Sequence, residues 1–167
     1  MMMRQFAFLF FAALFAATLN AAECPANVKA IPFHNVNQHQ MLVAVSINHS
    51  APYDFLLDTG TQMSVVDRSV ATELHLRTTG AATVAGVSFK GEAVFAQLDT
   101  LEVGDHTSTN LGVLVYDMKN LQAAGFAIRG LLGEDFLSRF DVLIDNAHSL
   151  ICLDDTGAMR GGLTSGN

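Results

Sequence analysis

Residues 53–67 read YDFLLDTGTQMSVVD, and this segment says more about the protein than any other part of the sequence. It begins as an apolar strand, Tyr53 to Leu57, and turns at Asp58-Thr59-Gly60, where the glycine permits a tight change of direction. Asp58 directly follows chain that is expected to be buried, and an ionised carboxylate in a dry environment is costly without a partner or a function. An Asp before Thr-Gly often only caps its own turn, so the triplet alone is a turn signal. The apolar residues on both sides of it favour a catalytic group at Asp58.

The remaining sequence alternates with period two or carries short apolar runs, which is typical of β-strands. Turn residues, mainly Gly, Asn, Asp and Pro, separate these runs. The pattern predicts an all-β domain with one or two short helices, drawn from 67–76, 117–124 and a capped turn at 134–140. Strands are expected at 41–47, 53–57, 64–66, 81–86, 87–103, 111–115, 130–133, 141–144 and 149–153.

The first residues have the layout of a secretory signal peptide. One positive charge at Arg4 precedes an apolar run from Phe6 to Leu19, and Ala21-Ala22 offers small residues for cleavage. The apolar run is short for a bilayer span, although an uncleaved membrane anchor stays an alternative. We expect an exported chain, periplasmic or secreted. The expected parts are a signal peptide, a lead-in, a folded domain and a flexible tail, at 1–22, 23–30, 31–153 and 154–167.

Composition limits the classes of partner. The chain has 167 residues, half of them apolar, and a formal net charge of −7. It has no basic run, which argues against a nucleic-acid partner because such proteins cluster Lys and Arg. Its six histidines lack the spacing of metal ligands, so no metal and no other cofactor are expected. Cys24 and Cys152 could form a bridge or stay as free thiols, and the sequence leaves both open.

The two ends of the expected domain resemble the retropepsin-like aspartic peptidases. The first signature is Ile31-Pro32-Phe33 followed by YDFLLDTGTQMSVVD, and the second is RGLLGEDFLSRFDVLIDNAHSLICL at 129–153. The resemblance runs from about Ile31 to Leu153 and implies a closed β-barrel of the acid-protease type. In this family an apolar-apolar-Gly strand supports the Asp-Thr-Gly loop, which assigns that role to Leu131-Leu132-Gly133.

The resemblance also implies an aspartic endopeptidase that hydrolyses peptide bonds with two carboxylates. Two carboxylates in contact cannot both ionise and therefore share one proton, as in the aspartic proteases. One then acts as base on a water and the other as acid. Since only one Asp-Thr-Gly is well framed, the second carboxylate is expected to be Asp58 of another copy, in a homodimer. In this active-site loop Thr59 would link the two copies, Gly60 would bring its N–H to the carboxylates, and the Thr61 hydroxyl could donate to one of them.

Two further segments concern the site. Asp155-Thr156-Gly157 repeats the triplet near the C-terminus, but it lacks apolar flanks and is predicted to have no catalytic role. Residues 83–89 occupy the position of the hairpin flap that related enzymes close over an extended peptide. Its substrate-binding tip is expected at Ala85, Gly86 and Val87, with an ordinary surface hairpin as the alternative. The expected substrate is therefore a peptide or protein.

Two other functions are compatible with the sequence. A catalytically silent peptide-binding or dimerisation module on the same fold would keep Asp58 without cleaving anything. An unrelated exported β-protein would carry Asp58 in an ordinary turn. Loss of cleavage when Asp58 alone is changed separates a peptidase from both, because likeness of fold does not prove activity. A membrane is expected as a partner only if the signal segment stays uncleaved.

Overall fold

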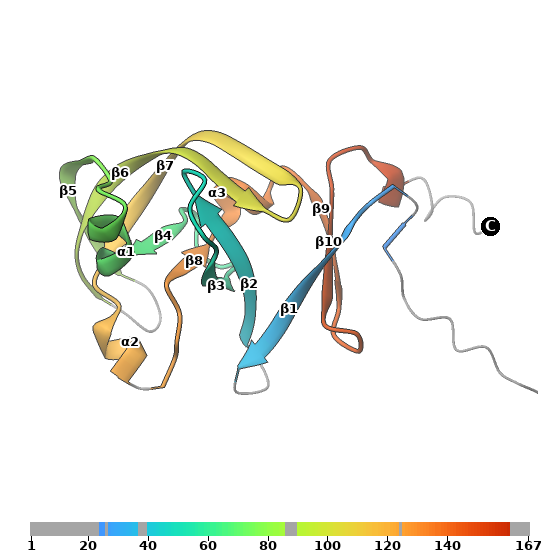
Figure 1. Cartoon of the computed structure of the whole chain (residues 1–167), viewed down its shortest axis with the longest axis horizontal. Helices are drawn as coiled ribbons and strands as arrows, with labels where there is room; N and C mark the ends of the chain where they lie inside the picture. The colour runs from blue at the N-terminus through green and yellow to red at the C-terminus, as the bar shows by residue number, and fades with distance from the viewer. Residues whose placement is uncertain (1–23, 26, 37–39, 86–89, 124, 161–167) are drawn as a thin grey trace, which may run out of the picture.

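The computed structural model describes residues 24–25, 27–36, 40–85, 90–123 and 125–160 (Figure 1). The strands are β1 (Ala30–Val36), β2 (Gln40–Ile47), β3 (Tyr53–Leu57), β4 (Val65–Asp67), β5 (Thr78–Ala85), β6 (Lys90–Val103), β7 (His106–Tyr116), β8 (Gly130–Leu132), β9 (Asp141–Asp145) and β10 (Leu150–Asp154). The helices are α1 (Arg68–Glu73), α2 (Lys119–Ala123) and α3 (Glu134–Leu137). The expected all-β class is confirmed, but the described part has these three short helices and further helical residues at 158–160, rather than one or two helices.

Most strand bounds agree closely with the sequence, with two exceptions. The sequence pattern predicts no strand where β1 lies, at Ala30–Val36, and β7 begins earlier than expected. The sequence pattern predicts a strand at 111–115, whereas β7 begins at His106. The residues of β7 before the predicted strand are mostly polar. The usual alternation of apolar and polar residues is absent there because Ser108, which points into the protein, is itself polar and almost fully buried. A buried serine therefore concealed the first half of this strand.

All the strands belong to one sheet, in the order β5-β6-β7-β4-β8-β3-β2-β1-β10-β9. The sheet curls until β2 also pairs with β6, at Ser46↔Glu102 and Ile47↔Leu101. That closure consists of two residue pairs, while β5 at one end and β1, β10 and β9 at the other extend past it. We therefore describe a strongly curled sheet, and the expected closed barrel and homodimer are not established by this single chain.

The interior of the curl is filled by aliphatic and aromatic side chains. Burying such side chains is the main favourable term in folding. The larger of two apolar clusters joins both sides of the curl and reaches helix α3, and its fully buried members include Val45, Ile47, Phe55, Leu98, Leu101 and Phe136. The smaller cluster fastens the segment around α2 to the sheet through Leu42, Val65, Met118, Ile128 and Leu131.

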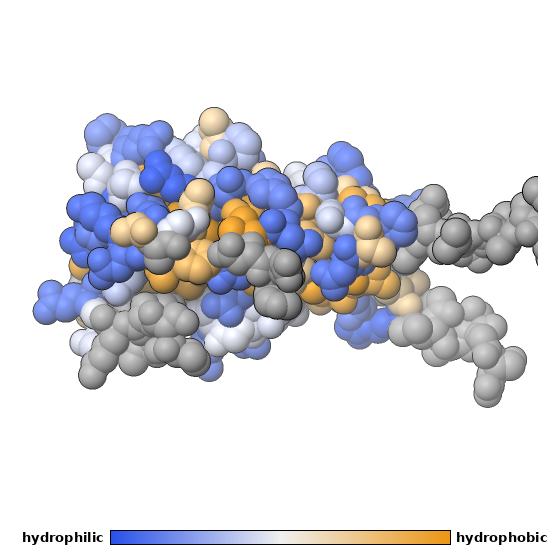
Figure 2. Space-filling view, turned by 90° about the horizontal axis from the view of Figure 1, so that it is seen from below, coloured by the Kyte–Doolittle hydropathy of each residue, from blue (hydrophilic) through white to orange (hydrophobic). Residues whose placement is uncertain are grey.

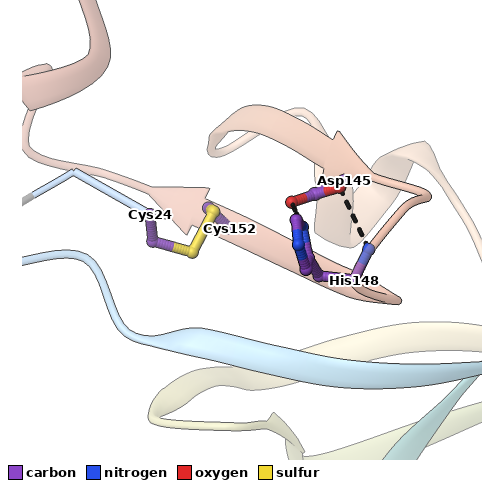
Figure 3. Close-up of a disulfide and its surroundings, with 4 residues drawn as sticks. All are labelled: Cys24, Asp145, His148 and Cys152. Atoms are coloured by element: carbon purple, nitrogen blue, oxygen red, sulfur yellow. Dashed lines mark hydrogen bonds and ion pairs between the residues drawn. A yellow bond between two sulfur atoms is a disulfide. The ribbon is translucent and has the colours of Figure 1, made fainter. Parts of the chain in front are cut away.

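Strand β1 changes partners along its length and connects the curl to the β9–β10 hairpin (Figure 1). Its first residues, Ala30–Pro32, pair with β10, and its last residues, Phe33–Val36, pair with β2. A disulfide joins Cys24 to Cys152 (Figure 3). Of the two possibilities that the sequence leaves open, a bridge and two free thiols, the structure has the bridge. The bridge ties the lead-in to the middle of β10.

The described part of the predicted tail is hydrogen-bonded to the end of β10. Asp154 is buried at the end of β10, and its carboxylate accepts hydrogen bonds from Thr156 N at 2.8 Å and Met159 N at 2.7 Å. These bonds to the ionised form lower the pKa of Asp154, the bond from Met159 contributing most. Within the predicted flexible tail, 154–167, these bonds join residues 156 and 159 to the end of β10, and the flexibility of the tail stays a prediction. Residues 161–167 and the predicted signal peptide at 1–22 lie outside the described residues.

Candidate active site

Asp58 lies at the first position after β3, where the chain leaves the sheet. Its backbone N–H donates to Leu132 O at 3.0 Å, and Gly60 N donates to Asp58 Oδ1 at 2.9 Å. The carboxylate is partly exposed, and Thr59 and Gly60 are exposed. The loop therefore presents its carboxylate at the surface of the single chain, which differs from the dry environment that the sequence suggests.

Strand β8 and the start of α3 hold this loop from behind. β8 runs parallel to β3 with Leu56↔Leu131 and Leu57↔Leu132 in register. Beyond it, Glu134 N donates to Thr61 O at 2.9 Å. A Cβ atom on Gly133 would lie 2.9 Å from Thr61 O, so only glycine fits at this contact. The structure thus brings Leu131-Leu132-Gly133 against the Asp58 loop, where the family resemblance expects them.

Two residues that the sequence analysis missed fasten the far end of the loop. Ser64 is completely buried, and its N–H and hydroxyl donate to the two carboxylate oxygens of Asp135, at 2.9 and 2.7 Å. The Ser64 hydroxyl oxygen also accepts from Gly133 N at 3.0 Å. A serine set inside the apolar run after Met63 was the available signal, but its partner lies 71 residues away.

The Thr61 hydroxyl has a different partner from the one expected. It donates to Met63 O at 3.3 Å and so braces its own loop rather than the carboxylate of Asp58. Thr59 has no side-chain hydrogen bond within the described part of one chain. Its proposed role, contact with a second copy, therefore stays a prediction.

A family model described as aspartyl protease matches residues 43–136, more than half of the chain, and spans both the Asp58 loop and β8. The chain belongs to the aspartyl protease family. The predicted resemblance to retropepsin-like aspartic peptidases is thereby confirmed. No curated protein matches the chain in sequence.

Solved structures add the fold. A retropepsin-like aspartic protease from Rickettsia conorii shares 21% identity, with 75% of this chain and 90% of that chain covered, at a TM-score of 0.55. The EIAV protease, solved with the inhibitor HBY-793, shares 23% over 63% of this chain and 92% of its own, at 0.48. The retroviral protease-like domain of Ddi1 from Leishmania major shares 17% over 70% and 89%, at 0.47. At these identities the likeness shows the fold alone, and this conclusion rests on the structure from Rickettsia conorii.

In this member of the aspartyl protease family, β5 and β6 form the hairpin at the predicted flap position. Their register runs from Thr78↔Ala96 to Ala85↔Lys90, with an irregularity between Thr79 and Ala81. Ala85 is the last described residue of β5. The other two predicted tip residues, Gly86 and Val87, lie outside the described residues, so their role in substrate binding stays a prediction.

The second triplet forms a capped turn remote in sequence from the β8 support. Asp155 is exposed, while the neighbouring Asp154 accepts the hydrogen bonds that shape the turn. Gly157 has φ +79°, as such a turn requires. Nothing in this arrangement resembles the framed loop of Asp58.

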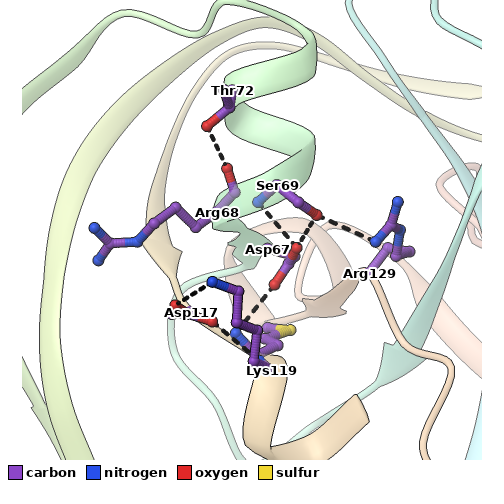
Figure 4. A network of polar contacts seen from close by, with 8 residues as sticks. Asp67, Arg68, Ser69, Thr72, Asp117, Lys119 and Arg129 are labelled. Carbon is purple, nitrogen blue, oxygen red and sulfur yellow. Dashed lines mark hydrogen bonds and ion pairs between the residues drawn. The ribbon is translucent and has the colours of Figure 1, made fainter. Parts of the chain in front are cut away.

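A buried carboxylate, Asp67, orders the chain at the end of β4 (Figure 4). It caps α1 by accepting from Ser69 N at 3.0 Å and from the Ser69 hydroxyl, and it also accepts from Met118 N at 3.0 Å. Arg129 Nη1 donates to the Ser69 hydroxyl at 3.1 Å. Asp67 thereby connects the end of β4 with the segments that lead into α2 and β8, which is a structural role.

The chain also has a polar pocket of about 290 Å³, lined by Gly91, Glu92, Tyr116, Asp117, Lys119 and Asn120, of which Gly91 and Glu92 lie near the start of β6. The backbone N–H of Lys119 donates to Asp117 at 3.0 Å and is the main cause of a lowered pKa for that carboxyl group. Asp58 does not line this pocket.

Within the described residues, no group of three or more His, Cys, Asp or Glu side chains is arranged to hold a metal ion. The same residues include no helix long and apolar enough to cross a bilayer.

Proposed function

We propose that this chain is an aspartic endopeptidase in which Asp58 of two identical subunits forms the catalytic pair. The observation that supports this most is the Asp58 loop itself, which is braced from behind by 132–135 yet exposed at Thr59 and Gly60. A rigid base keeps the carboxylate in a defined place, and an open tip leaves room for the same loop of a second copy. A single chain offers one such carboxylate within its described residues.

In the proposed reaction one carboxylate of the pair is ionised and the other protonated, because two carboxyl groups in contact cannot both ionise. The ionised carboxylate takes a proton from water, whose oxygen attacks the peptide carbonyl carbon, while the protonated carboxyl gives its proton to the carbonyl oxygen. The tetrahedral intermediate then collapses. The C–N bond breaks as the leaving nitrogen receives the proton that the first carboxylate took from water, and the second carboxylate takes the proton of one hydroxyl of the intermediate as the product carboxyl group forms, so the pair again holds one proton. Gly60 N–H, which donates to Asp58 Oδ1 at 2.9 Å, keeps that oxygen in position.

We further propose that the enzyme acts outside the cytoplasm on peptide or protein substrates. The signal layout at 1–22 supports export, and the Cys24–Cys152 bridge suits an oxidising compartment, where disulfides form and persist. The β5–β6 hairpin supports a peptide substrate, since an extended peptide can pair with such a hairpin backbone to backbone.

The test is cleavage of a diverse peptide mixture between about pH 3 and 7, the range in which carboxylates titrate, by mature chain beginning near Glu23. Asp58→Asn and Asp155→Asn are run in parallel, and circular dichroism checks that each is folded. The proposal expects cleavage by the parent and by Asp155→Asn, and none by Asp58→Asn. A folded, dimeric parent that cleaves nothing would favour the silent peptide-binding or dimerisation module instead.

A further inference from the structure

The polar pocket beside the β5–β6 hairpin is a cavity to which the proposed reaction gives no role. It measures about 290 Å³, and its lining comes from residues 91–92 at the start of β6 and from four residues in 116–120, where the chain leaves β7 and enters α2. Sites for small ligands begin at about 300 Å³. The pocket therefore has room for one long side chain of a ligand.

The pocket lies next to the part of the hairpin where the proposed function places the peptide. Glu92 pairs with Thr83, two positions from the last described pair of β5 and β6, Ala85↔Lys90. An extended peptide advances about 3.3 Å per residue, and its side chains alternate between its two faces. A peptide that pairs with this end of the hairpin therefore passes within one or two residues of the pocket, and one of its side chains can enter.

The charged groups of the pocket are unbalanced. Its lining residues carry two carboxylates, on Glu92 and Asp117, and one ammonium group, on Lys119. Lys119 Nζ lies 3.6 Å from Asp117 Oδ2 and its side chain is 83% exposed, and so long and exposed an ion pair is weak. Arg68 also acts on Asp117, but it does not line the pocket and is the weakest cause of the lowered pKa of that carboxyl group. Glu92 is exposed and has no hydrogen bond or ion pair within the described part of the chain.

The wall on the α2 side of the pocket is held in place by hydrogen bonds. Asp67 is almost fully buried and accepts from Met118 N at 3.0 Å, which fixes the chain between Asp117 and Lys119 (Figure 4). Lys119 N donates to Asp117 Oδ1 at 3.0 Å and so orients that carboxylate, whose Oδ2 faces the Lys119 ammonium group. An acceptor that is already fixed loses less conformational freedom when it binds a ligand.

These features suit a basic side chain better than an apolar or acidic one. Figure 2 shows mostly hydrophilic surface at the end of the molecule that carries α2, β5 and β6, and apolar surface along the middle. Tyr116 adds an aromatic ring to the lining, and a Cβ atom on Gly91 would lie 3.1 Å from Tyr116 Cε2, so the ring lies directly against the hairpin. A guanidinium group binds carboxylates through two parallel hydrogen bonds and also stacks on aromatic rings, which an ammonium group does less well.

We propose that this pocket binds one basic side chain of the peptide substrate, arginine in preference to lysine, with Glu92 and Asp117 as the acceptors. The bound guanidinium group takes the place of the Lys119 ammonium group at Asp117 Oδ2. The formal net charge of −7 adds a long-range attraction for a basic peptide. The inference rests on the proposed function, because that function supplies the peptide, and it adds the class of peptide that the enzyme prefers.

The first experiment measures binding without cleavage. An isotope-labelled Asp58→Asn chain, beginning near Glu23, is titrated with acetyl-arginine amide and with acetyl-citrulline amide, which has nearly the same shape and no charge. The arginine probe should shift the amide NMR signals of residues 91–92 and 117–120 more than the citrulline probe does. Glu92→Gln should weaken arginine binding about threefold, and Lys119→Gln, which removes the competing cation, should tighten it about threefold. Equal shifts with both probes, or none at these residues, would overturn the proposal.

The second experiment measures the preference in cleavage. A peptide that the parent cleaves is remade with arginine, citrulline or glutamate at each position in turn. At one position arginine should exceed citrulline about tenfold in kcat/KM. The difference should lie in KM, since the pocket binds the substrate and the transition state alike.

Charge reversal gives this experiment its matched control. Glu92→Lys should turn the preference at that position from arginine toward glutamate. Asp99→Lys makes the same change at an exposed carboxylate of β6 that does not line the pocket, and should keep the preference of the parent. A preference that survives Glu92→Lys, or that Asp99→Lys also reverses, would show that the pocket does not select the side chain.

The outcomes also separate this proposal from the proposed function. Cleavage that depends on Asp58, without a preference for arginine over citrulline at any position, would retain the peptidase and overturn the pocket. Binding of acetyl-arginine amide that depends on Glu92, by a parent that cleaves nothing, would do the opposite. Neither binding nor cleavage would overturn both.

Discussion

Replacing Asp135 with alanine tests whether the Ser64–Asp135 contact holds the Asp58 loop in place. Asp135 accepts from Ser64 N at 2.9 Å and from the Ser64 hydroxyl at 2.7 Å, and Ser64 is completely buried. The substitution leaves two buried donors without acceptors, and each such donor costs about 1–3 kcal/mol. Because Asp135 is only partly buried, water can reach part of the vacated space. We expect the free energy of unfolding to fall by about 2–4 kcal/mol, a large share of the 5–15 kcal/mol typical of a domain.

Glu134→Ala is the matched control for this prediction. Glu134 and Asp135 both lie in the first turn of α3, so each removal takes one negative charge from the same helix end. The Glu134 side chain is exposed, and the hydrogen bond from its backbone N–H to Thr61 O survives the substitution. We expect its effect on stability to stay within about 0.5 kcal/mol. Any difference between the two variants is then due to the contacts of the Asp135 carboxylate, which are those with Ser64 and a hydrogen bond from Phe136 N at 3.0 Å.

The assay is urea unfolding followed by circular dichroism, combined with peptide cleavage at a urea concentration where both variants are folded. The Asp135→Ala variant should lose kcat more than it changes KM, since the altered part is the base of the Asp58 loop and not a substrate contact. Asp135→Asn keeps the side-chain shape and one acceptor, and should fall between the parent and Asp135→Ala. Equal stability and equal kcat for Asp135→Ala and Glu134→Ala would refute this reasoning.

Three further results are expected. Replacing Cys24 and Cys152 together by serine should lower the free energy of unfolding by up to about 5 kcal/mol, because their bridge closes a loop with a sequence separation of 128; urea unfolding equal to the oxidised parent would contradict this. Thr61→Ala should leave the acid limb of the pH–rate profile in place, since the Thr61 hydroxyl bonds to a carbonyl in its own loop, and a shifted limb would restore the role suggested by sequence. The hydrogen bond from His148 is the main cause of the lowered pKa of Asp145, which stabilises the folded state above the unfolded pKa of about 4. The stability advantage of the parent over His148→Ala should therefore be present at pH 6 and decline as the pH falls below about 4, and an advantage independent of pH would show another cause.

Much of the fold could be predicted from local sequence because turns and strands have local signals. Neighbouring residues in the sequence are enough to predict three features: the turn at Asp58-Thr59-Gly60, the apolar run before it, and the later segment Leu131-Leu132-Gly133. The bounds of β3 match the expectation fully, and α1 begins one residue after its cap, Asp67. These elements depend on periodicity and turn chemistry that a stretch of ten residues contains in full.

The errors have the opposite origin, in contacts between distant parts of the chain. The Ser64–Asp135 contact spans 71 positions, and neither residue is distinctive alone. The Thr61 hydroxyl donates to Met63 O and not to the Asp58 carboxylate suggested by sequence, because the bend of the finished loop decides which acceptor it meets. The Asp154 carboxylate accepts the hydrogen bonds that shape the turn after β10, and its burial depends on the folded chain rather than on its sequence neighbours.

The sequence alone determined the family, the β class and the carboxylate to which a catalytic role is proposed. Each of these can be predicted from the types of side chain in a short stretch of sequence. Tertiary structure decided which strands become neighbours, that Cys24 meets Cys152, what braces the Asp58 loop and that β9 ends the sheet with an apolar face. The physical reason is that burial and hydrogen bonding between distant segments depend on the assembled chain. A residue such as Val142 has the same side chain in a core or at an edge, and only the position of its strand leaves it exposed.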